Sequence, residues 1–307
     1  MTAMQGEIFY WVFNMSITAS VTGVFVMLVR RTKRIPGRLM VLLWLAPFLR
    51  MICPLGLNSP YSLMSLLSQI TTKTIVVYRP VEELSLSMMN SILAADAYFP
   101  MTYKTNVLKS IFEVAGAIWI IVSLALLLMM FALYFTTIRE LRDSVHLRDN
   151  VYFSEKLVSP AVYGMVKPRI VIPAAYRDGS LDLILWHEKI HIQCLDNLWR
   201  MLAFVIAAFH WFNPLCLIFL KQLLADIELA CDERVLAAIG ADRARDYASA
   251  LLACRQGSSV FASAFGGAKI RVRIENILSF KRLTGFSLTV FAVLLGIIFY
   301  VLLTNAV

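Results

Sequence analysis

The sequence predicts a mainly α-helical membrane protein in which a cytosolic α+β domain is inserted between the third and fourth of four transmembrane helices. The 307-residue chain is 59% hydrophobic, and its mean hydropathy of +0.72 is far above that of a soluble globular protein. Four apolar stretches are long enough to cross the hydrocarbon core of a bilayer, which takes roughly 20 helical residues. About 150 more polar residues separate the third stretch from the fourth, enough for one domain.

The predicted spans cover residues 8–29, 39–57, 111–135 and 285–304. The first stretch is too long for a secretory signal and lacks a basic lead-in and a small-residue cleavage site, so we expect a retained anchor. The spans divide the chain into a membrane region, a cytosolic domain, and the fourth span with a short external tail: 1–135 (with an extracellular loop at 58–110), 136–284 and 285–307.

Basic residues set the expected orientation. Three basic clusters fall on one side of the membrane if the spans alternate: the connection at 30–38, the pair Arg139 and Arg142, and the pair Lys281 and Arg282. The positive-inside rule makes that side the cytosol, so the N-terminus lies outside. The basic residues behind the net charge of +9 therefore set the membrane orientation and contact anionic lipid headgroups. We expect no direct contact with nucleic acid.

The cytosolic domain begins with short β-branched runs bounded by prolines over residues 151–173, which predict a small sheet or hairpin. Its edge either holds an extended peptide by strand addition or only caps the helices. Residues 181–197 have the apolar stripe of a helix. The apolar stretch 201–220 is predicted to form a buried or membrane-hugging hairpin that bends at Asn213 and Pro214.

The strongest chemical signal is His187-Glu188-Lys189-Ile190-His191 in the first of these helices. Residues four apart share a helix face, so His187 and His191 can bind one metal ion. Glu188 then stands beside the ion without binding it, which suits the general base of a metal-assisted hydrolysis. The alternative is a pair of surface histidines on an amphipathic helix.

A catalytic zinc site usually has three protein ligands, so one more must come from elsewhere. In the acidic run 226–233, Glu228 and Asp232 share a face if the run is helical. We predict that Glu228 binds Zn²⁺ together with His187 and His191, while Asp232 braces a ligand from behind. The alternative is a solvated acidic helix face. The five scattered cysteines predict neither disulfides nor a cysteine-based metal site.

Together these motifs resemble the BlaR/MecR-type antirepressor family of integral membrane zinc metallopeptidases. The matching segments are 159–173, His187-Glu-Lys-Ile-His191 with Asp196, His210-Trp-Phe-Asn-Pro-Leu215, 228–236 and Arg273-Ile-Glu-Asn-Ile-Leu278. The resemblance implies a gluzincin-like domain with His187, His191 and Glu228 as zinc ligands and Glu188 as general base. It also implies a bacterial plasma-membrane protein that relays an external signal, cleaves itself and promotes loss of a DNA-binding repressor.

The expected partners are a peptide or protein substrate, with a DNA-binding repressor among them, membrane lipid and a second copy of the chain. Family members that sense β-lactams carry a penicillin-binding sensor after the fourth span, whereas this sequence ends at Val307. Covalent β-lactam sensing therefore does not follow from it. Two alternatives stay open: a membrane quality-control zinc protease, and a non-catalytic signalling scaffold. Glu188 argues against the scaffold, because a structural ion needs no neighbouring base.

Overall fold

The computed structural model describes residues 2–32, 35–53, 59–63, 65, 106–157, 159–164, 167–173, 182–254, 268–280 and 285–304. Most of the loop expected at 58–110 lies outside these residues, as do Leu181, Lys281 and Arg282. The main elements are α1 (Thr2–Arg31), α2 (Gly37–Ile52), α5 (Asn106–Glu140), β1 (Val145–Arg148), β2 (Val151–Ser154), β3 (Ala161–Tyr163), β4 (Arg169–Pro173), α6 (Asp182–Gln193), α7 (Asp196–Phe209), α8 (Pro214–Ile239), α9 (Ala244–Ala253), α11 (Ile270–Leu278) and α12 (Gly285–Leu303).

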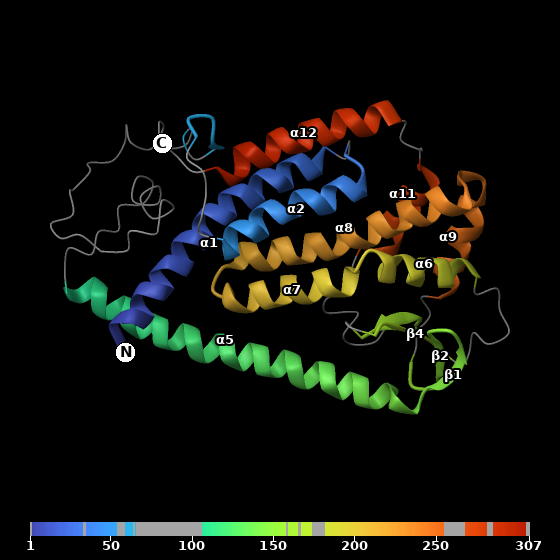
Figure 1. Ribbon diagram of the computed structural model, residues 1–307, viewed down its shortest axis with the longest axis horizontal. Coiled ribbons are helices and arrows are strands. Elements are labelled where there is room, and N and C mark those ends of the chain that lie inside the picture. The colour runs from blue at the N-terminus through green and yellow to red at the C-terminus, as the bar shows by residue number, and fades with distance from the viewer. Residues whose placement is uncertain are drawn as a thin grey trace.

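A helical bundle forms one part of the molecule, with α1, α2, α7, α12 and the first part of α8 lying side by side (Figure 1). Helix α5 packs along α1. The bundle encloses a buried apolar cluster, here called the bundle core, whose larger members include Val26, Met40, Leu43, Trp44, Phe48, Ile206, Phe219, Leu220, Leu223, Leu224, Ile227 and Leu302. This continuous apolar packing fixes where α8 lies relative to α1 and α2.

A second apolar cluster, here called the site core, lies between α6, α9, α11 and the later part of α8 (Figure 1). Its buried members are Leu183, Ile184, Ile190, Cys231, Val235, Leu236, Tyr247, Ala248, Leu251 and Ile277. Helix α8 runs through both clusters, with Ile227 in the bundle core and Cys231 in the site core. Glu228 therefore stands at the boundary between them.

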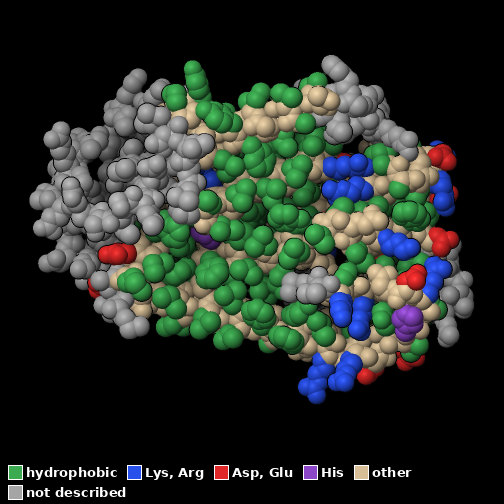
Figure 2. All heavy atoms as spheres, in the orientation of Figure 1, with side chains coloured by type: hydrophobic (Ala, Val, Ile, Leu, Met, Phe, Trp, Pro, Cys, Tyr) green, Lys and Arg blue, Asp and Glu red, His purple; other side chains and the backbone are tan. Residues whose placement is uncertain are grey.

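Two stretches of the described chain are long and apolar enough to span a membrane, Met4–Arg31 and Ile111–Asp143. The other two predicted spans are shorter there: α2 has 16 residues, and Thr289–Leu303 is the apolar part of α12. Large apolar side chains on α5 face outward, and Ile121 is 68% exposed. Figure 2 shows hydrophobic side chains over the bundle and charged ones gathered at the end that holds the sheet and α9. This distribution suits a membrane-embedded bundle.

The last turn of α12 is held by a buried arginine of α2. Arg50 is 6% exposed; its Nε donates to the carbonyl oxygen of Leu302 at 3.0 Å, and its Nη2 donates to that of Thr304 at 2.8 Å. The final carbonyl groups of a helix have no partner within the helix, so these bonds stabilise its end. Helices α2 and α12 are thereby fixed in register.

The sheet predicted near residues 151–173 is present, and it includes β1, which the sequence reading did not foresee. The strand order is β1-β2-β4-β3. Strand β2 pairs antiparallel with β1 and parallel with β4, and β3 pairs antiparallel with β4. Ile170 and Ile172 of β4 pack on Leu185 of α6. The sheet therefore supports the helix that carries the His187 motif.

The helix predicted over 181–197 is broken in two, which corrects that expectation. Helix α6 ends at Gln193, and α7 begins at Asp196 after a bend of 57°. Leu195 makes the break, because its backbone is left-handed with φ of 54°. Leucine seldom adopts that conformation, and no glycine or proline marks the site. The break places Asp196 back beside α6.

The predicted hairpin bends where expected. Helix α7 ends at Phe209 and α8 begins at Pro214, with the Asn213 Oδ1 atom accepting the backbone N–H of Leu215 at 3.0 Å. The Asn213 amide also donates to the hydroxyl oxygens of Ser16 and Ser20, each at 2.7 Å. These bonds fix the turn to α1. Helix α8 then runs back along α7 and brings Glu228 to α6 (Figure 1).

Candidate metal centre

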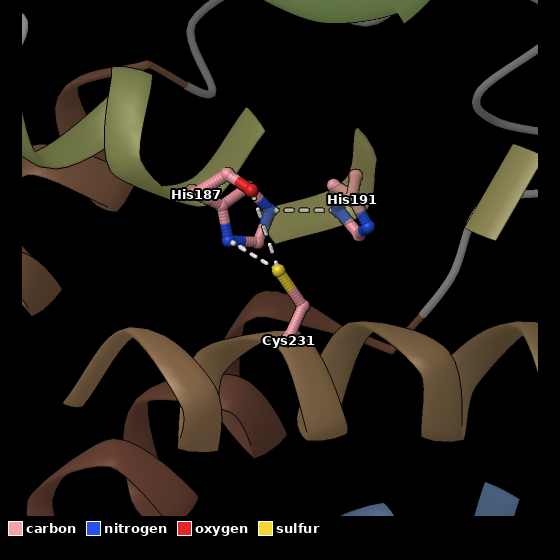
Figure 3. A group of neighbouring side chains, drawn as sticks. All are labelled: His187, His191 and Cys231. Carbon is pink, nitrogen blue, oxygen red and sulfur yellow. Dashed lines mark hydrogen bonds between the residues drawn. The ribbon is translucent and has the colours of Figure 1, made fainter. Parts of the chain in front are cut away.

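Helix α6 presents His187 and His191 on one face, as their four-residue spacing requires. The two residues are only 5% and 6% exposed, and their Nε2 atoms lie 3.1 Å apart. Figure 3 shows the two rings on successive turns with these nitrogens facing each other. Leu183, Ile184 and Ile190 of the same helix pack in the site core. The histidines are therefore buried, which excludes the alternative of a surface pair.

Asp196 orients the His191 ring. The Asp196 carboxylate, 4% exposed, lies 2.5 Å from the His191 Nδ1 atom. An ionised carboxylate only accepts hydrogen bonds, so Nδ1 carries the proton and the lone pair of Nε2 is left for a metal. Metal-binding histidines commonly have such a carboxylate partner. The resemblance included Asp196 as a matching residue; the turn at Leu195 explains its placement.

Tyr247 and Asp232 orient the His187 ring. The Tyr247 hydroxyl donates to the Asp232 carboxylate at 2.7 Å, and its oxygen lies 2.8 Å from the His187 Nδ1 atom. With the hydroxyl hydrogen directed to Asp232, the Tyr247 oxygen accepts from Nδ1–H, which leaves the Nε2 lone pair facing His191 and the Arg273 Nη2 atom, 3.3 Å away. Arg273 holds Asp232 through two bonds of 2.7 and 2.8 Å. Asp232 thus acts through Tyr247, a residue that sequence reasoning missed.

The structure brings Glu228 to both histidines. One carboxylate oxygen lies 3.7 Å from the His187 Nε2 atom, and the other lies 3.7 Å from the His191 Nε2 atom. A tetrahedral zinc site with bonds of about 2.0–2.1 Å places its ligand atoms roughly 3.3–3.4 Å apart. The observed separations lie on either side of that value. The three donors predicted from sequence therefore lie at separations that a small metal ion could bridge.

Two arginines contact the Glu228 carboxylate: Arg200 of α7 at 2.5 Å and Arg273 of α11 at 3.0 Å. Burial alone would raise the pKa of Glu228, but Arg273 and Arg200 outweigh it and hold that pKa well below its ordinary value. For the pKa of Arg273, burial and the neighbouring charges act in the opposite directions. Burial would lower its pKa, yet Asp232 and Glu228 raise it well above the ordinary value. Glu228 is therefore ionised, as a metal ligand must be.

The charges of this cluster favour a divalent cation. Its charged groups are four carboxylates and two guanidiniums: Glu188, Asp196, Glu228, Asp232, Arg200 and Arg273. The carboxyl groups of this cluster therefore outnumber its guanidinium groups by two. Buried charge is costly unless it is paired, and a doubly charged cation between the imidazoles would balance it.

Glu188 lies on the same helix as the histidines and is 7% exposed. Burial raises the pKa of its carboxyl group, and Glu228 raises it further, while His187, Arg200 and Arg273 oppose the shift. A carboxyl group whose pKa is moved towards neutrality is suited to taking up and releasing a proton. The role of Glu188 as general base stays a prediction.

Cys231 lies beside the histidines, where the sequence reading expected no cysteine. Its sulfur forms a candidate metal-binding group with His187 and His191 (Figure 3). The sulfur, however, lies 3.3 Å from the Nδ1 atom of His187, on the other side of the ring from Nε2. Burial, together with Glu228 and Asp232, raises the thiol pKa well above its ordinary value. Cys231 and Glu228 are thus alternative third donors, and Glu228 is the one that faces both Nε2 atoms.

His210, part of a segment in the resemblance, lies away from these contacts. It occupies the turn between α7 and α8, is 2% exposed, and its Nε2 atom lies 3.2 Å from the carbonyl oxygen of Met51. It therefore ties the hairpin to α2.

Two comparisons with known proteins found similar sequences. Residues 10–277 match the family described as BlaR1 peptidase M56. Two methicillin resistance mecR1 proteins, from Staphylococcus aureus strain Mu50 and Staphylococcus epidermidis, are each 29% identical over 108 residues. The aligned part covers 34% of this chain and only 18% of each relative's length.

Proposed function

The chain belongs to the BlaR1 peptidase M56 family, and from this premise we propose that it is an integral membrane zinc metallopeptidase that relays a signal as an antirepressor. In this proposal it cleaves itself, a cytosolic transcriptional repressor, or both. The similarity to methicillin resistance mecR1 proteins supports the signalling role. The observation that carries the proposal is the convergence of Glu228 on the Nε2 atoms of His187 and His191.

The ion would be held by the His187 and His191 Nε2 atoms and a Glu228 oxygen. When bound, zinc polarises a peptide carbonyl and lowers the pKa of water towards neutrality. Asp196 and Tyr247 keep the two rings in the tautomer and orientation that binding needs.

Glu188 carries out the proton transfers of the proposed hydrolysis. It accepts a proton from the attacking water, whose oxygen forms the new bond to the carbonyl carbon. It then delivers that proton to the leaving nitrogen as the carbon–nitrogen bond breaks. The products are a carboxylate and an amine. Because burial raises the pKa of Glu188, the carboxyl group is a stronger base than an exposed glutamate and a ready proton donor.

The proposed membrane arrangement keeps four spans, with the N-terminus outside and the domain at 136–284 in the bacterial cytosol. The basic clusters of the sequence support this orientation. The distribution in Figure 2 also supports it, because the charged end of the molecule coincides with α9 and the sheet, next to the site core.

Two variants of the intact protein in membranes test the proposal. Glu188→Gln should retain zinc by metal analysis and lose peptide cleavage by about 10²–10⁴-fold, because the general base is removed. Glu228→Ala should lower zinc content as well as cleavage. Undiminished proteolysis by Glu188→Gln would refute the mechanism, and undiminished zinc in Glu228→Ala would refute the ligand assignment.

A cellular comparison separates the regulatory role from the two alternatives. Proteins cut in cells that carry the wild type, but left intact with Glu188→Gln, are the substrates. The proposal expects the chain itself or a DNA-binding repressor. A broad set of damaged membrane proteins would indicate quality control, and full signalling by Glu188→Gln would indicate a scaffold.

A further inference from the structure

Helix α8 carries two sets of acidic residues on different faces. Asp226, Ala230 and Glu233 are spaced at i, i+4 and i+7 and share one face. Glu228 is two residues after Asp226, a turn of about 200° around the helix axis, so it points away from that face. The contacts follow this division: Glu228 faces the histidines of α6, while Asp226 contacts the end of α1 and Glu233 contacts the first turn of α2.

Asp226 is clamped by helices α1 and α2 of the bundle. The carboxylate is 2% exposed. The Arg30 Nε atom, at the end of α1, donates to its two oxygens at 3.0 and 2.8 Å. The indole N–H of Trp44, a residue of α2 with no exposed surface, donates to it at 2.7 Å. Charge-assisted bonds to a buried carboxylate are strong and directional, so this clamp fixes α8 to the α1–α2 pair.

Glu233 forms a second clamp on the same face. Its side chain accepts the backbone N–H groups of Gly37 at 2.8 Å and Arg38 at 3.3 Å, in the first turn of α2. No side chain of the preceding residue, Pro36, caps that helix. Arg38 returns a bond to the Glu233 carbonyl oxygen at 2.8 Å.

The second clamp needs a residue without a side chain at position 37. A Cβ atom on Gly37 would lie 3.1 Å from both the Ala230 backbone nitrogen and a Glu233 carboxylate oxygen. That spacing is tighter than ordinary van der Waals contact. The close approach of α2 to α8 therefore depends on glycine there.

We propose that Asp226 and Glu233 are positioning residues for the metal ligand Glu228, so that the α1–α2 pair determines the metal affinity of the site. This inference rests on the proposed zinc site. The side chains of a helix reach about 5–6 Å from its axis, so a rotation of α8 by about 10° moves the Glu228 carboxylate by about 1 Å. The two clamps oppose that rotation from the side of the bundle, whereas His187 and His191 lie on α6, which packs in the site core and on the sheet.

The test uses the full chain in detergent micelles, with Zn²⁺ and Co²⁺ as the probes. Arg30→Gln loosens the first clamp without altering α8 itself. It should weaken zinc binding about tenfold, at the lower end of what residues that support metal ligands contribute. It should also change the visible absorption spectrum of the Co²⁺-loaded protein, which reports ligand geometry. Trp44→Phe, which removes the N–H donor together with part of the buried ring, should act in the same direction and replaces Arg30→Gln if that variant does not fold.

Asn213→Ala is the matched control. It releases the same helix from α1 at its opposite end, where Asn213 binds Ser16 and Ser20. It should lower the unfolding temperature and leave zinc affinity and the Co²⁺ spectrum unchanged.

The outcomes separate the inference from the function on which it rests. If the clamp variants lose stability but keep wild-type zinc affinity and spectrum, Asp226 is only structural and the positioning role is overturned. If Asn213→Ala weakens zinc binding as much as Arg30→Gln does, the effect is general loosening, which also overturns it. If the wild type binds no zinc, or Glu228→Ala binds it as tightly as the wild type, the metal site itself is wrong.

Discussion

The bundle core and the site core bury polar groups for different purposes. In the bundle, polar side chains join one helix to the next, as Asn213 joins α8 to Ser16 and Ser20. In the site core, charged groups share partners, so that Arg273 contacts both Glu228 and Asp232. The comparison suggests that apolar packing places α8, whereas a connected polar network determines what its residues can bind.

The largest expected effect tests whether the bundle core is purely structural. Phe219→Ala removes a ring with no exposed surface that packs on Trp44, with ring centroids 5.7 Å apart. We expect a loss of about 3–5 kcal/mol in the free energy of unfolding. Zinc affinity of the folded protein should fall less than in Arg30→Gln, because Phe219 reaches the Asp226 clamp only through its packing on Trp44. Thermal unfolding and zinc titration of the same sample measure both. A large loss of zinc affinity would break the comparison.

The second prediction concerns the same helix in the other core. Leu236→Ala truncates a side chain that is 1% exposed in the site core and should cost about 2–5 kcal/mol. Here zinc affinity should fall as well, because the site core holds α8 against α6. Equal zinc affinities in Leu236→Ala and Phe219→Ala would show that the two cores do not differ in this respect.

A substitution with a smaller expected effect tests the polar network of the site core by itself. Tyr247→Phe keeps the ring and removes the hydroxyl that links His187 to Asp232. We expect zinc affinity to fall by about 10–100-fold, as is usual when the partner of a ligand histidine is lost. Tyr300→Phe is the control, since its hydroxyl contacts Ser59 at 2.9 Å in the bundle region. Equal zinc affinities in the two variants would remove Tyr247 from the site.

The smallest effect is expected at the surface of α11. Arg271 pairs with Glu275 at 2.8 Å, but its side chain is 88% exposed. Exposed pairs contribute little, so Arg271→Gln should change the unfolding free energy by no more than about 0.5 kcal/mol and leave zinc binding intact. Arg273→Gln, two residues along, leaves Asp232 and Glu228 short of a buried partner and should impair both. A zinc defect in Arg271→Gln would show that the network extends to the surface.

Sequence reasoning succeeded where one helix decides the geometry. The four-residue spacing places His187 and His191 together, and the same spacing puts Glu228 and Asp232 on one face of α8. The hairpin that returns α8 to the site was also predictable, because Asn213 and Pro214 mark its turn.

The features of the site that the sequence did not predict depend on tertiary contacts. Tyr247 lies 60 residues from His187, and Arg200 lies 28 residues from Glu228, in segments with no motif of their own. The break at Leu195 was missed because leucine gives no signal for a left-handed turn. Cys231 was set aside because scattered spacing says nothing about which cysteine a fold brings next to a histidine.

The bonds from Arg50 to the end of α12 have a mechanical consequence. A force on the last turn of α12 passes through this guanidinium into α2, whose 16 residues form a rod about 24 Å long. The other end of α2 is its first turn, where the backbone N–H of Gly37 donates to the Glu233 carboxylate. Tension applied at one surface of the bundle would therefore arrive as a displacement of α8, beside the carboxylate on which metal capture depends.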